Sequence, residues 1–169
     1  MLRALTLAGG VAGAAALSQF PEFSQQYLQR LAGKVEALTL VVAEFDASAA
    51  RNDLTRDAAL AQMSGSRFLD DRQADLRRLI DRQGRLSDNL TVLRLSGPLE
   101  RLGMPHRLAD AETLSATWGD FRPAVPLTVD GAISAALGFV AGWGAVSAVF
   151  GLLAWPFRRR SRKQPPDRA

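Results

Sequence analysis

The distribution of apolar residues divides the chain into two uncharged stretches and a mixed region between them. The longer stretch, residues 131–157, contains 27 residues without a charge. A helix of about 20 apolar residues crosses the hydrocarbon core of a bilayer, so this stretch is long enough to span it. Trp155 fits an interfacial aromatic belt, Pro156 is expected to end the helix, and the arginines that follow mark the cytoplasmic side. The pattern predicts a transmembrane helix over residues 128–157.

A shorter uncharged stretch follows Arg3 near the N-terminus. Residues 4–20 carry no charge, and we predict a first transmembrane helix over residues 1–20. The alternative is a cleaved signal peptide, because Ala14 and Ala16 are small residues of the kind that precede a cleavage site. Either interpretation exports residues 21–127, which are periplasmic if the source is a Gram-negative bacterium. With the first helix retained, both termini are cytoplasmic and the protein resides in the bacterial inner membrane.

Both predicted spans carry small residues at four-residue spacing. Gly9 is followed by Gly13, and Gly138 is followed by Gly142. In lipid, this spacing lets two helix backbones approach closely, which favours their association. We therefore expect these glycines to be transmembrane helix contacts, although spans rich in glycine and alanine also produce the spacing by chance. The pattern leaves open whether the contact joins the two spans, two copies or another protein.

Between the two stretches, apolar residues recur in alternating steps of three and four. The first seam consists of Leu28, Leu31, Val35, Leu38, Val42 and Phe45. The second seam consists of Leu69, Arg72, Leu76, Leu79, Gln83, Leu86, Leu90 and Leu93. This period is typical of helices that pack as coiled coils, so we predict an antiparallel hairpin over residues 21–95. Thr55 and Ser66 are the expected helix caps in its connector.

A two-helix hairpin buries only one stripe of each helix, so apolar residues outside these stripes must pack against another surface. Four such residues lie off the seams: Val41, Leu54, Leu60 and Ile80. They predict contact with a further helix, a second copy or a partner. Residues 96–127 are broken by glycine and proline, and we interpret them as a membrane-proximal segment with a short helix. Trp118 and Phe121 lie either at headgroup level or against the hairpin.

The charge of the chain is distributed unevenly. The net charge is +4, yet residues 21–127 contain 14 basic and 15 acidic residues. The excess of basic residues therefore lies in the tail, residues 158–169, directly after the predicted span. A basic cluster at this place contacts anionic lipid. The expected lipid contacts are Arg158, Arg159, Arg160, Arg162 and Lys163. Nucleic-acid binding by the middle region is disfavoured, because it lacks a clustered positive charge.

The chain offers little for catalysis or metal binding. It has no cysteine and one histidine, His106, so thiolate sites are excluded and an imidazole cluster is not possible within one chain. We interpret His106 as a loop residue. Asp75 with Arg78 and Asp81 with Arg85 have the spacing of ion pairs on a solvated helix face. Neither a phosphate-binding loop nor a dinucleotide fingerprint occurs, so no cofactor or small-molecule substrate is identified.

Three strings in the chain resemble a known family. They are LSQFPEF at residues 17–23, DFRPAVPLT at residues 120–128 and AGWG at residues 141–144. The family comprises short proteobacterial inner-membrane proteins catalogued as a domain of unknown function. The resemblance covers nearly the whole chain and implies that both spans are retained. It brings no activity, cofactor or catalytic residue.

The sequence therefore predicts an all-α protein in which two transmembrane helices flank an extracytoplasmic, coiled-coil-like helical hairpin. We expect an accessory or scaffolding subunit that acts by contact with lipid and with another membrane protein or a second copy. The alternative is an extracytoplasmic sensor. Because residues 158–169 are too short for an output domain, a sensor would signal through a separate partner. An enzyme with an unfamiliar site is the third hypothesis.

Overall fold

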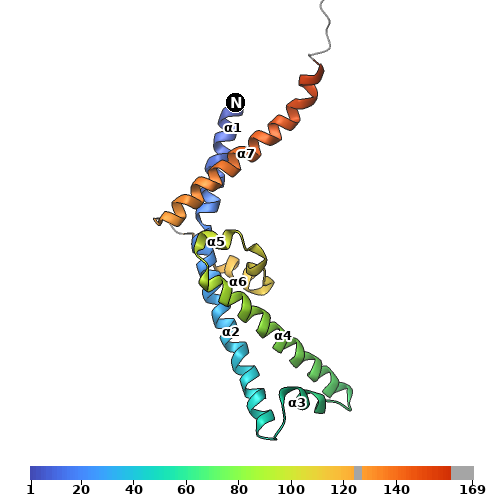
Figure 1. The fold of residues 1–169 in the computed structure, drawn as a ribbon. Coiled ribbons are helices and arrows are strands. Elements are labelled where there is room, and N and C mark those ends of the chain that lie inside the picture. The colour runs from blue at the N-terminus through green and yellow to red at the C-terminus, as the bar shows by residue number, and fades with distance from the viewer. Residues whose placement is uncertain (124–126, 161–169) are drawn as a thin grey trace, which may run out of the picture. The chain divides into compact units, whose positions relative to one another are not determined.

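The computed structural model describes residues 1–123 and 127–160, with side chains except for Leu2 and residues 154–160. All regular secondary structure in these residues is helical, as predicted (Figure 1). The helices are α1 (Leu2–Ser18), α2 (Phe20–Ala50), α3 (Arg56–Gln62), α4 (Arg67–Leu95), α5 (Pro98–Leu102), the 3-10 helix η1 (Pro105–Leu108), α6 (Ala111–Asp120) and α7 (Val129–Arg160). The chain forms two compact units. The terminal unit comprises Met1–Glu22 and Pro123–Ala169, and the central unit comprises Phe23–Arg122.

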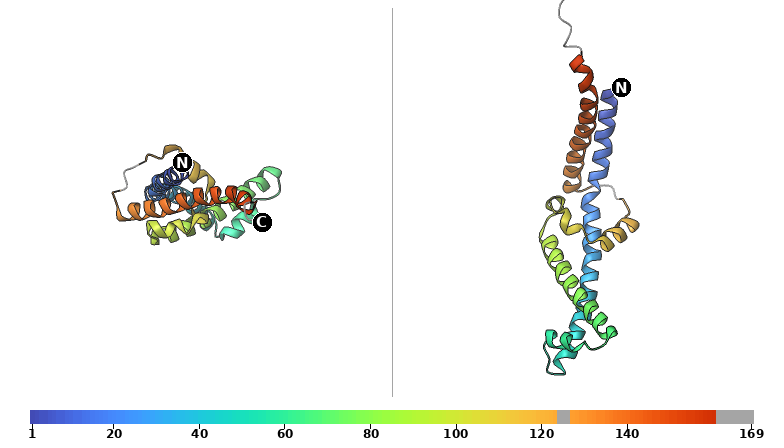
Figure 2. Two further views of the ribbon diagram at one scale, coloured as in Figure 1. Left: turned by 90° about the horizontal axis from the view of Figure 1, so that it is seen from above. Right: turned by 90° about the vertical axis from the view of Figure 1, so that its right-hand side faces the viewer.

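The terminal unit is a pair of apolar helices, α1 and α7, that lie side by side (Figure 2). Among the described residues, one helical segment is long and apolar enough to cross a membrane, Val129–Leu153, with a mean hydropathy of 1.9. Helix α1 has 17 residues. Helix α7 extends to Arg160, so the prediction that Pro156 ends it was wrong. Proline removes one backbone hydrogen bond, which an otherwise continuous apolar helix tolerates.

The central unit begins with α2, α3 and α4, which the sequence delimits through its caps. Helix α2 ends at Ala50, and Asp53 then adopts a positive φ of 58° in the turn. The Thr55 hydroxyl accepts a hydrogen bond from the Ala58 amide at 3.2 Å and begins α3. The Ser66 hydroxyl accepts one from the Leu69 amide at 3.3 Å and begins α4. Both predicted caps are therefore confirmed.

The two predicted seams are buried to different extents. In α2, Leu28, Leu31, Val35 and Val42 are buried, whereas α4 buries only Leu86, Leu90 and Leu93. Toward α3 the two long helices diverge (Figure 1). The side chain of Leu60 in α3 is 2% exposed, and Gln73 of α4 donates a hydrogen bond to its carbonyl at 2.5 Å. The prediction of coiled-coil packing along both seams was therefore wrong: α2 and α4 make few close backbone contacts, and the N-terminal half of α4 contacts α3 instead.

The opposite end of the central unit is closed by α5, η1 and α6. Its core includes Tyr27, Leu31 and Leu93, all with no exposed surface. Arg101 of α5 is 6% exposed, and its Nε donates to the Leu93 carbonyl at 3.0 Å, near the end of α4. Burial lowers the pKa of this guanidinium. Here the helix ends are held by hydrogen bonds from side chains, which satisfy carbonyls that a helix terminus leaves open.

Candidate functional site

The helices α1 and α7 cross where glycine meets glycine. A methyl group added at Gly13 would overlap the carbonyl oxygen of Gly138 and lie 3.2 Å from the Cα atom of Gly142. A methyl group at Gly142 would overlap the carbonyl oxygen of Gly9. Because Gly9 faces Gly142 and Gly13 faces Gly138, the helices run antiparallel. The structure thus brings together all four glycines that the sequence singled out, in a contact within one chain.

Three further residues complete this crossing: Gly10, which shares the four-residue spacing with Ala14, and Phe139 and Val146, which the spacing did not indicate. A Cβ atom on Gly10 would lie 2.7 Å from Cε2 of Phe139, and one on Gly9 would lie 3.2 Å from Cβ of Val146. The crossing is confined to one face of α7, because a methyl group at Gly144 or Gly151 would meet no atom within 4 Å. Close approach therefore depends on which face a glycine occupies, and the number of glycines does not determine it.

One polar side chain is enclosed in the terminal unit without a partner. Ser134, one turn before Gly138, has no exposed surface, and its hydroxyl has no hydrogen-bond partner among the described residues. By contrast, the buried hydroxyl of Ser18 donates to the Ala15 carbonyl at 2.9 Å. An unpaired buried hydroxyl costs stability. Its place beside the crossing makes Ser134 a probe of how tightly this interface is packed.

The central unit contains a second candidate site, a polar cluster formed by Tyr27, Lys34, Arg82, Asp110 and Thr113, which we call the Asp110 cluster. Asp110 precedes α6 and accepts hydrogen bonds from the Thr113 amide at 3.0 Å and the Thr113 hydroxyl at 2.6 Å. Lys34 of α2 approaches it to 3.0 Å and Arg82 of α4 to 3.2 Å. The Asp110 amide donates to the Tyr27 hydroxyl at 3.3 Å. One carboxylate therefore connects α2, α4 and α6.

The electrostatics of the Asp110 cluster favour the ionised carboxylate. Burial alone raises the pKa of Asp110, but the hydrogen bonds from Thr113, Lys34 and Arg82 outweigh it and hold the pKa well below its ordinary value. Glu112 lies 2.7 Å from Arg82 and 3.0 Å from Lys34. Hydrogen bonds from both side chains lower the pKa of Glu112, and the one from Arg82 contributes most. These interactions stabilise the ionised form of both carboxylates. The cluster fastens helices together.

The chain matches a family model described as Protein of unknown function (DUF2937), over residues 1–159. The chain belongs to this family. The three strings that carried the resemblance all lie within the matched residues. No curated protein and no solved structure matches the chain. Membership in the DUF2937 family is therefore established, while the activity has to be inferred from the geometry.

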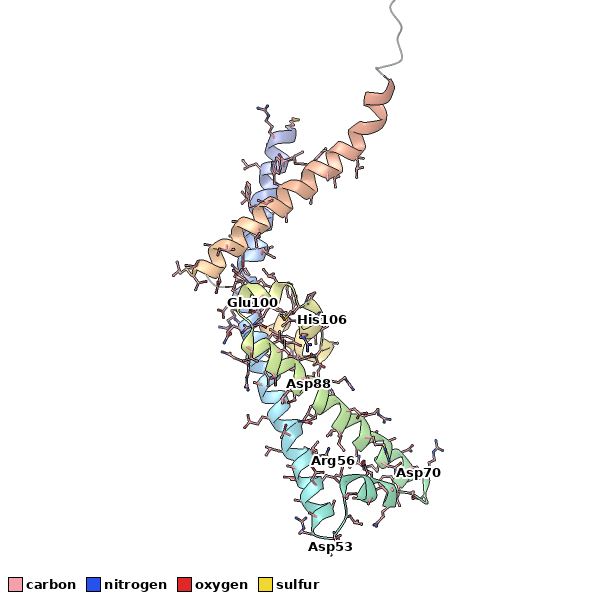
Figure 3. All side chains as sticks on the ribbon, viewed as in Figure 1. Asp53, Arg56, Asp70, Asp88, Glu100 and His106 are labelled. Atoms are coloured by element: carbon pink, nitrogen blue, oxygen red, sulfur yellow. The ribbon has the colours of Figure 1, made fainter. Side chains whose placement is uncertain are left out.

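The remaining candidate residues of this DUF2937 protein lie on the surface of the central unit (Figure 3). His106 is exposed on η1, at an open cleft of about 230 Å³ that Arg85 and Asn89 also line. Among the described residues, no three histidine, aspartate or glutamate side chains are grouped so that they could hold a metal ion. Asp75 and Arg78 form the predicted ion pair.

Other sequence predictions meet different outcomes. Asp81 and Arg85 both line a cleft beside α4, but they form no ion pair in the described structure, so this predicted pair was wrong. Gln83, one of two polar seam residues, donates to the Thr39 hydroxyl of α2 at 3.0 Å. The other, Arg72, is 60% exposed. The expected lipid contacts lie outside the described residues, namely the side chains of Arg158, Arg159 and Arg160 and all of Arg162 and Lys163.

Proposed function

We propose that this protein is an integral inner-membrane protein with two spans, α1 and α7, that acts by protein–protein contact as an accessory or scaffolding subunit of a membrane complex. The observation that carries the proposal is the glycine crossing of α1 and α7. At this crossing the backbones approach without large side chains between them, and this is how helices associate when lipid removes the hydrophobic driving force.

The outer faces of the two helices support a lipid environment. Large apolar side chains on both helices are exposed: Leu5, Leu7, Val11, Ile133, Leu137, Val140, Trp143, Val149, Leu152 and Leu153. In water they would form an apolar surface larger than soluble monomers usually expose, whereas lipid tails cover such a surface at no cost. Helix α1 reaches about 26 Å, slightly less than the hydrocarbon core, which local thinning of the bilayer accommodates.

The crossing also favours retention of the first helix over cleavage of a signal peptide. Gly138 and Gly142 contact α1 through Gly13 and Gly9. Removal of residues 1–20 would leave this face of α7 without the helix that fits it. Retention, together with the basic residues after residue 157, supports a topology with both termini in the cytoplasm and residues 21–127 in the periplasm.

Reporter fusions test this topology. A periplasm-dependent reporter fused after Leu95 is expected to be active, and the same reporter fused after Ala169 is expected to be silent. A matched cytoplasmic reporter should give the reverse pattern at both sites. Activity of the periplasmic reporter after Ala169 would overturn the proposed orientation.

The proposed contact role rests on apolar side chains that the central unit leaves uncovered. Leu40 is 61% exposed, Val41 is 44% exposed and Phe68 is 71% exposed. Singly these are ordinary, but Leu40 and Val41 are adjacent on α2, outside the buried seam. They support a partner that binds along α2.

Photo-crosslinking in living cells tests the contact role. A photoreactive residue at Leu40 is expected to capture a defined membrane protein or a second copy, whereas the same residue at exposed Asp88 on α4 should capture neither. If neither position gives an adduct, and the protein purified in mild detergent is a monodisperse monomer, a scaffolding role loses its support.

A further inference from the structure

Helix α6 turns two polar side chains toward the core and two large apolar side chains outward. Its inward face carries Thr113 and Thr117, which are each 1% exposed. Its outward face carries Leu114 and Trp118, one turn apart, which are 37% and 73% exposed. A helix packed on the core of a soluble protein normally turns its leucine and tryptophan inward. The reversal indicates that something outside the described structure covers the outward face.

The inward face tolerates threonine because both hydroxyls are satisfied within the helix and its cap. The Thr113 hydroxyl donates to the Asp110 carboxylate at 2.6 Å, and the Thr117 hydroxyl donates to the Thr113 carbonyl at 2.7 Å. Burial therefore leaves no open hydrogen bond on this side. The orientation of α6 is fixed by the Asp110 cluster, so Leu114 and Trp118 are held outward.

The exposed tryptophan is also fixed at one edge. The Phe23 ring meets the Trp118 ring edge to face with centroids 6.0 Å apart, and it meets the Phe121 ring at 5.5 Å. Asp120, at the end of α6, binds Arg30 of α2 at 2.7 Å. The sequence predicted Trp118 and Phe121 either at headgroup level or against the hairpin. Both rings contact Phe23 of α2, but Phe121 is half-buried whereas most of Trp118 stays exposed.

The position of α6 in the chain indicates what covers it. Trp118 precedes Val129, the first residue of α7, by 11 positions. Even a fully extended chain of this length spans at most about 40 Å, so the outward face stays within about 40 Å of the start of α7 and can reach a bilayer that α7 crosses. Leu114 suits the edge of the acyl chains, and Trp118 suits the headgroup level of a lipid interface. The exposed Arg122 that follows suits anionic headgroups.

We propose that the outward face of α6, formed by Ala111, Leu114 and Trp118, inserts into the headgroup region of the bilayer on the side where the central unit lies. The bound partner is therefore a lipid surface. This inference rests on the proposed function, because α7 must span the bilayer for the tether to act. Docking of α6 would hold the Asp110 cluster, and with it the ends of α2 and α4, next to the membrane.

The test uses full-length protein with one tryptophan, reconstituted into vesicles of phosphatidylcholine and phosphatidylglycerol with or without bromine on the acyl chains. The substitutions Trp143→Phe and Trp155→Phe leave Trp118 alone. The control replaces all three tryptophans with phenylalanine and adds Phe68→Trp at the distant end of the central unit. Phe68 is 71% exposed, so the two probes match in exposure within the protein.

We expect brominated lipid to quench Trp118 several-fold more than the probe at position 68, and aqueous iodide to quench it several-fold less. Leu114→Glu should reduce the difference. Equal quenching at both positions would overturn the inference. Protection of Trp118 from iodide without quenching by brominated lipid would also overturn it, in favour of a second copy or another protein.

A third single-tryptophan protein separates this inference from the proposed function. Trp143 on the outer face of α7 is 50% exposed, and in a lipid-spanning helix it must be quenched by brominated lipid. If Trp143 is quenched and Trp118 is not, α7 spans the bilayer and only the docking of α6 is wrong. If neither is quenched, the proposed membrane role is wrong as well.

Discussion

The terminal and central units are held together in opposite ways. In the terminal unit, α1 and α7 approach through glycines, and the large apolar side chains point outward. In the central unit, side chains such as Leu31 and Leu93 form a buried apolar core, and the Asp110 carboxylate joins three helices through charged hydrogen bonds. The difference supports the proposal that one chain is adapted to two solvents, because lipid favours close backbone contact and water favours apolar burial.

The largest effect is expected when a glycine at the crossing of α1 and α7 is replaced by a larger residue. Gly13→Leu should separate α1 from α7, because the new side chain meets the Gly138 backbone, which cannot move aside. Overpacking typically costs about 1–3 kcal/mol, and a clash with backbone that cannot move is at the upper end of this range. Gly144→Leu, placed where α7 has open space, should have little effect.

Disulfide crosslinking in membranes measures this prediction. The chain has no cysteine, so the pair Gly9→Cys and Val146→Cys reports contact of α1 with α7 without background. The Cβ separation of 3.2 Å is slightly short for a disulfide, and cysteine in place of valine gives room to adjust. Equal crosslinking in the Gly13→Leu and Gly144→Leu proteins would show that Gly13 does not lie at a close contact between α1 and α7.

In the central unit, the corresponding change is Asp110→Ala. It removes the cap of α6 and leaves Lys34 and Arg82 without their shared carboxylate. We expect a loss of about 3 kcal/mol, from the cap and the broken, partly buried ion pairs together. Asp88→Ala, on the exposed face of α4, should change stability by less than about 0.5 kcal/mol.

Hydrogen exchange of the full-length protein in mild detergent locates this effect. Amides of α6 should lose protection in the Asp110→Ala protein, while amides of the α1–α7 crossing should keep theirs. Loss of protection in both units would contradict the separation into two independently held parts.

Acid should weaken the central unit through the same carboxylate. Because the folded state lowers the pKa of Asp110 below its ordinary value of 3.8, this group stabilises the fold at higher pH. The contribution is lost as the pH falls below about 4. Urea unfolding between pH 6 and about 2.5 should show a smaller acid-induced loss in the Asp110→Asn protein than in the unchanged chain. Identical pH profiles would exclude Asp110 as the source.

Sequence patterns predict the helices and the glycine contacts better than the arrangement of the central unit. Apolar periodicity locates α2 and α4, and the caps of α3 and α4 follow from Thr55 and Ser66, because these signals are local. The four glycines are visible as spacing. Their pairing within one chain requires the structure, since the same spacing serves a dimer equally well.

The Asp110 cluster could not be predicted in this way. Lys34, Arg82 and Asp110 are far apart in the sequence, and each resembles an ordinary surface charge among many. The only local signal is Asp110 three residues before Thr113, which is the spacing of a helix cap. The predicted packing of α2 against the whole of α4 was wrong for a related reason. Periodicity alone does not reveal that α3 takes the place of α2 beside the first half of α4.

The smallest expected effects come from removing one hydroxyl from each unit. The two changes should alter the stability of their units in opposite directions. Ser134→Ala removes a buried hydroxyl that has no partner in the described residues, so it should stabilise the terminal unit, by about 1 kcal/mol. Tyr27→Phe removes a buried hydroxyl that accepts from the Asp110 amide at 3.3 Å, so it should destabilise the central unit by a similar amount. The cysteine-pair crosslink reports the first change and α6 hydrogen exchange the second. If Ser134→Ala weakens the crossing, its hydroxyl bonds across the interface in the membrane, and the terminal unit also depends on a polar contact.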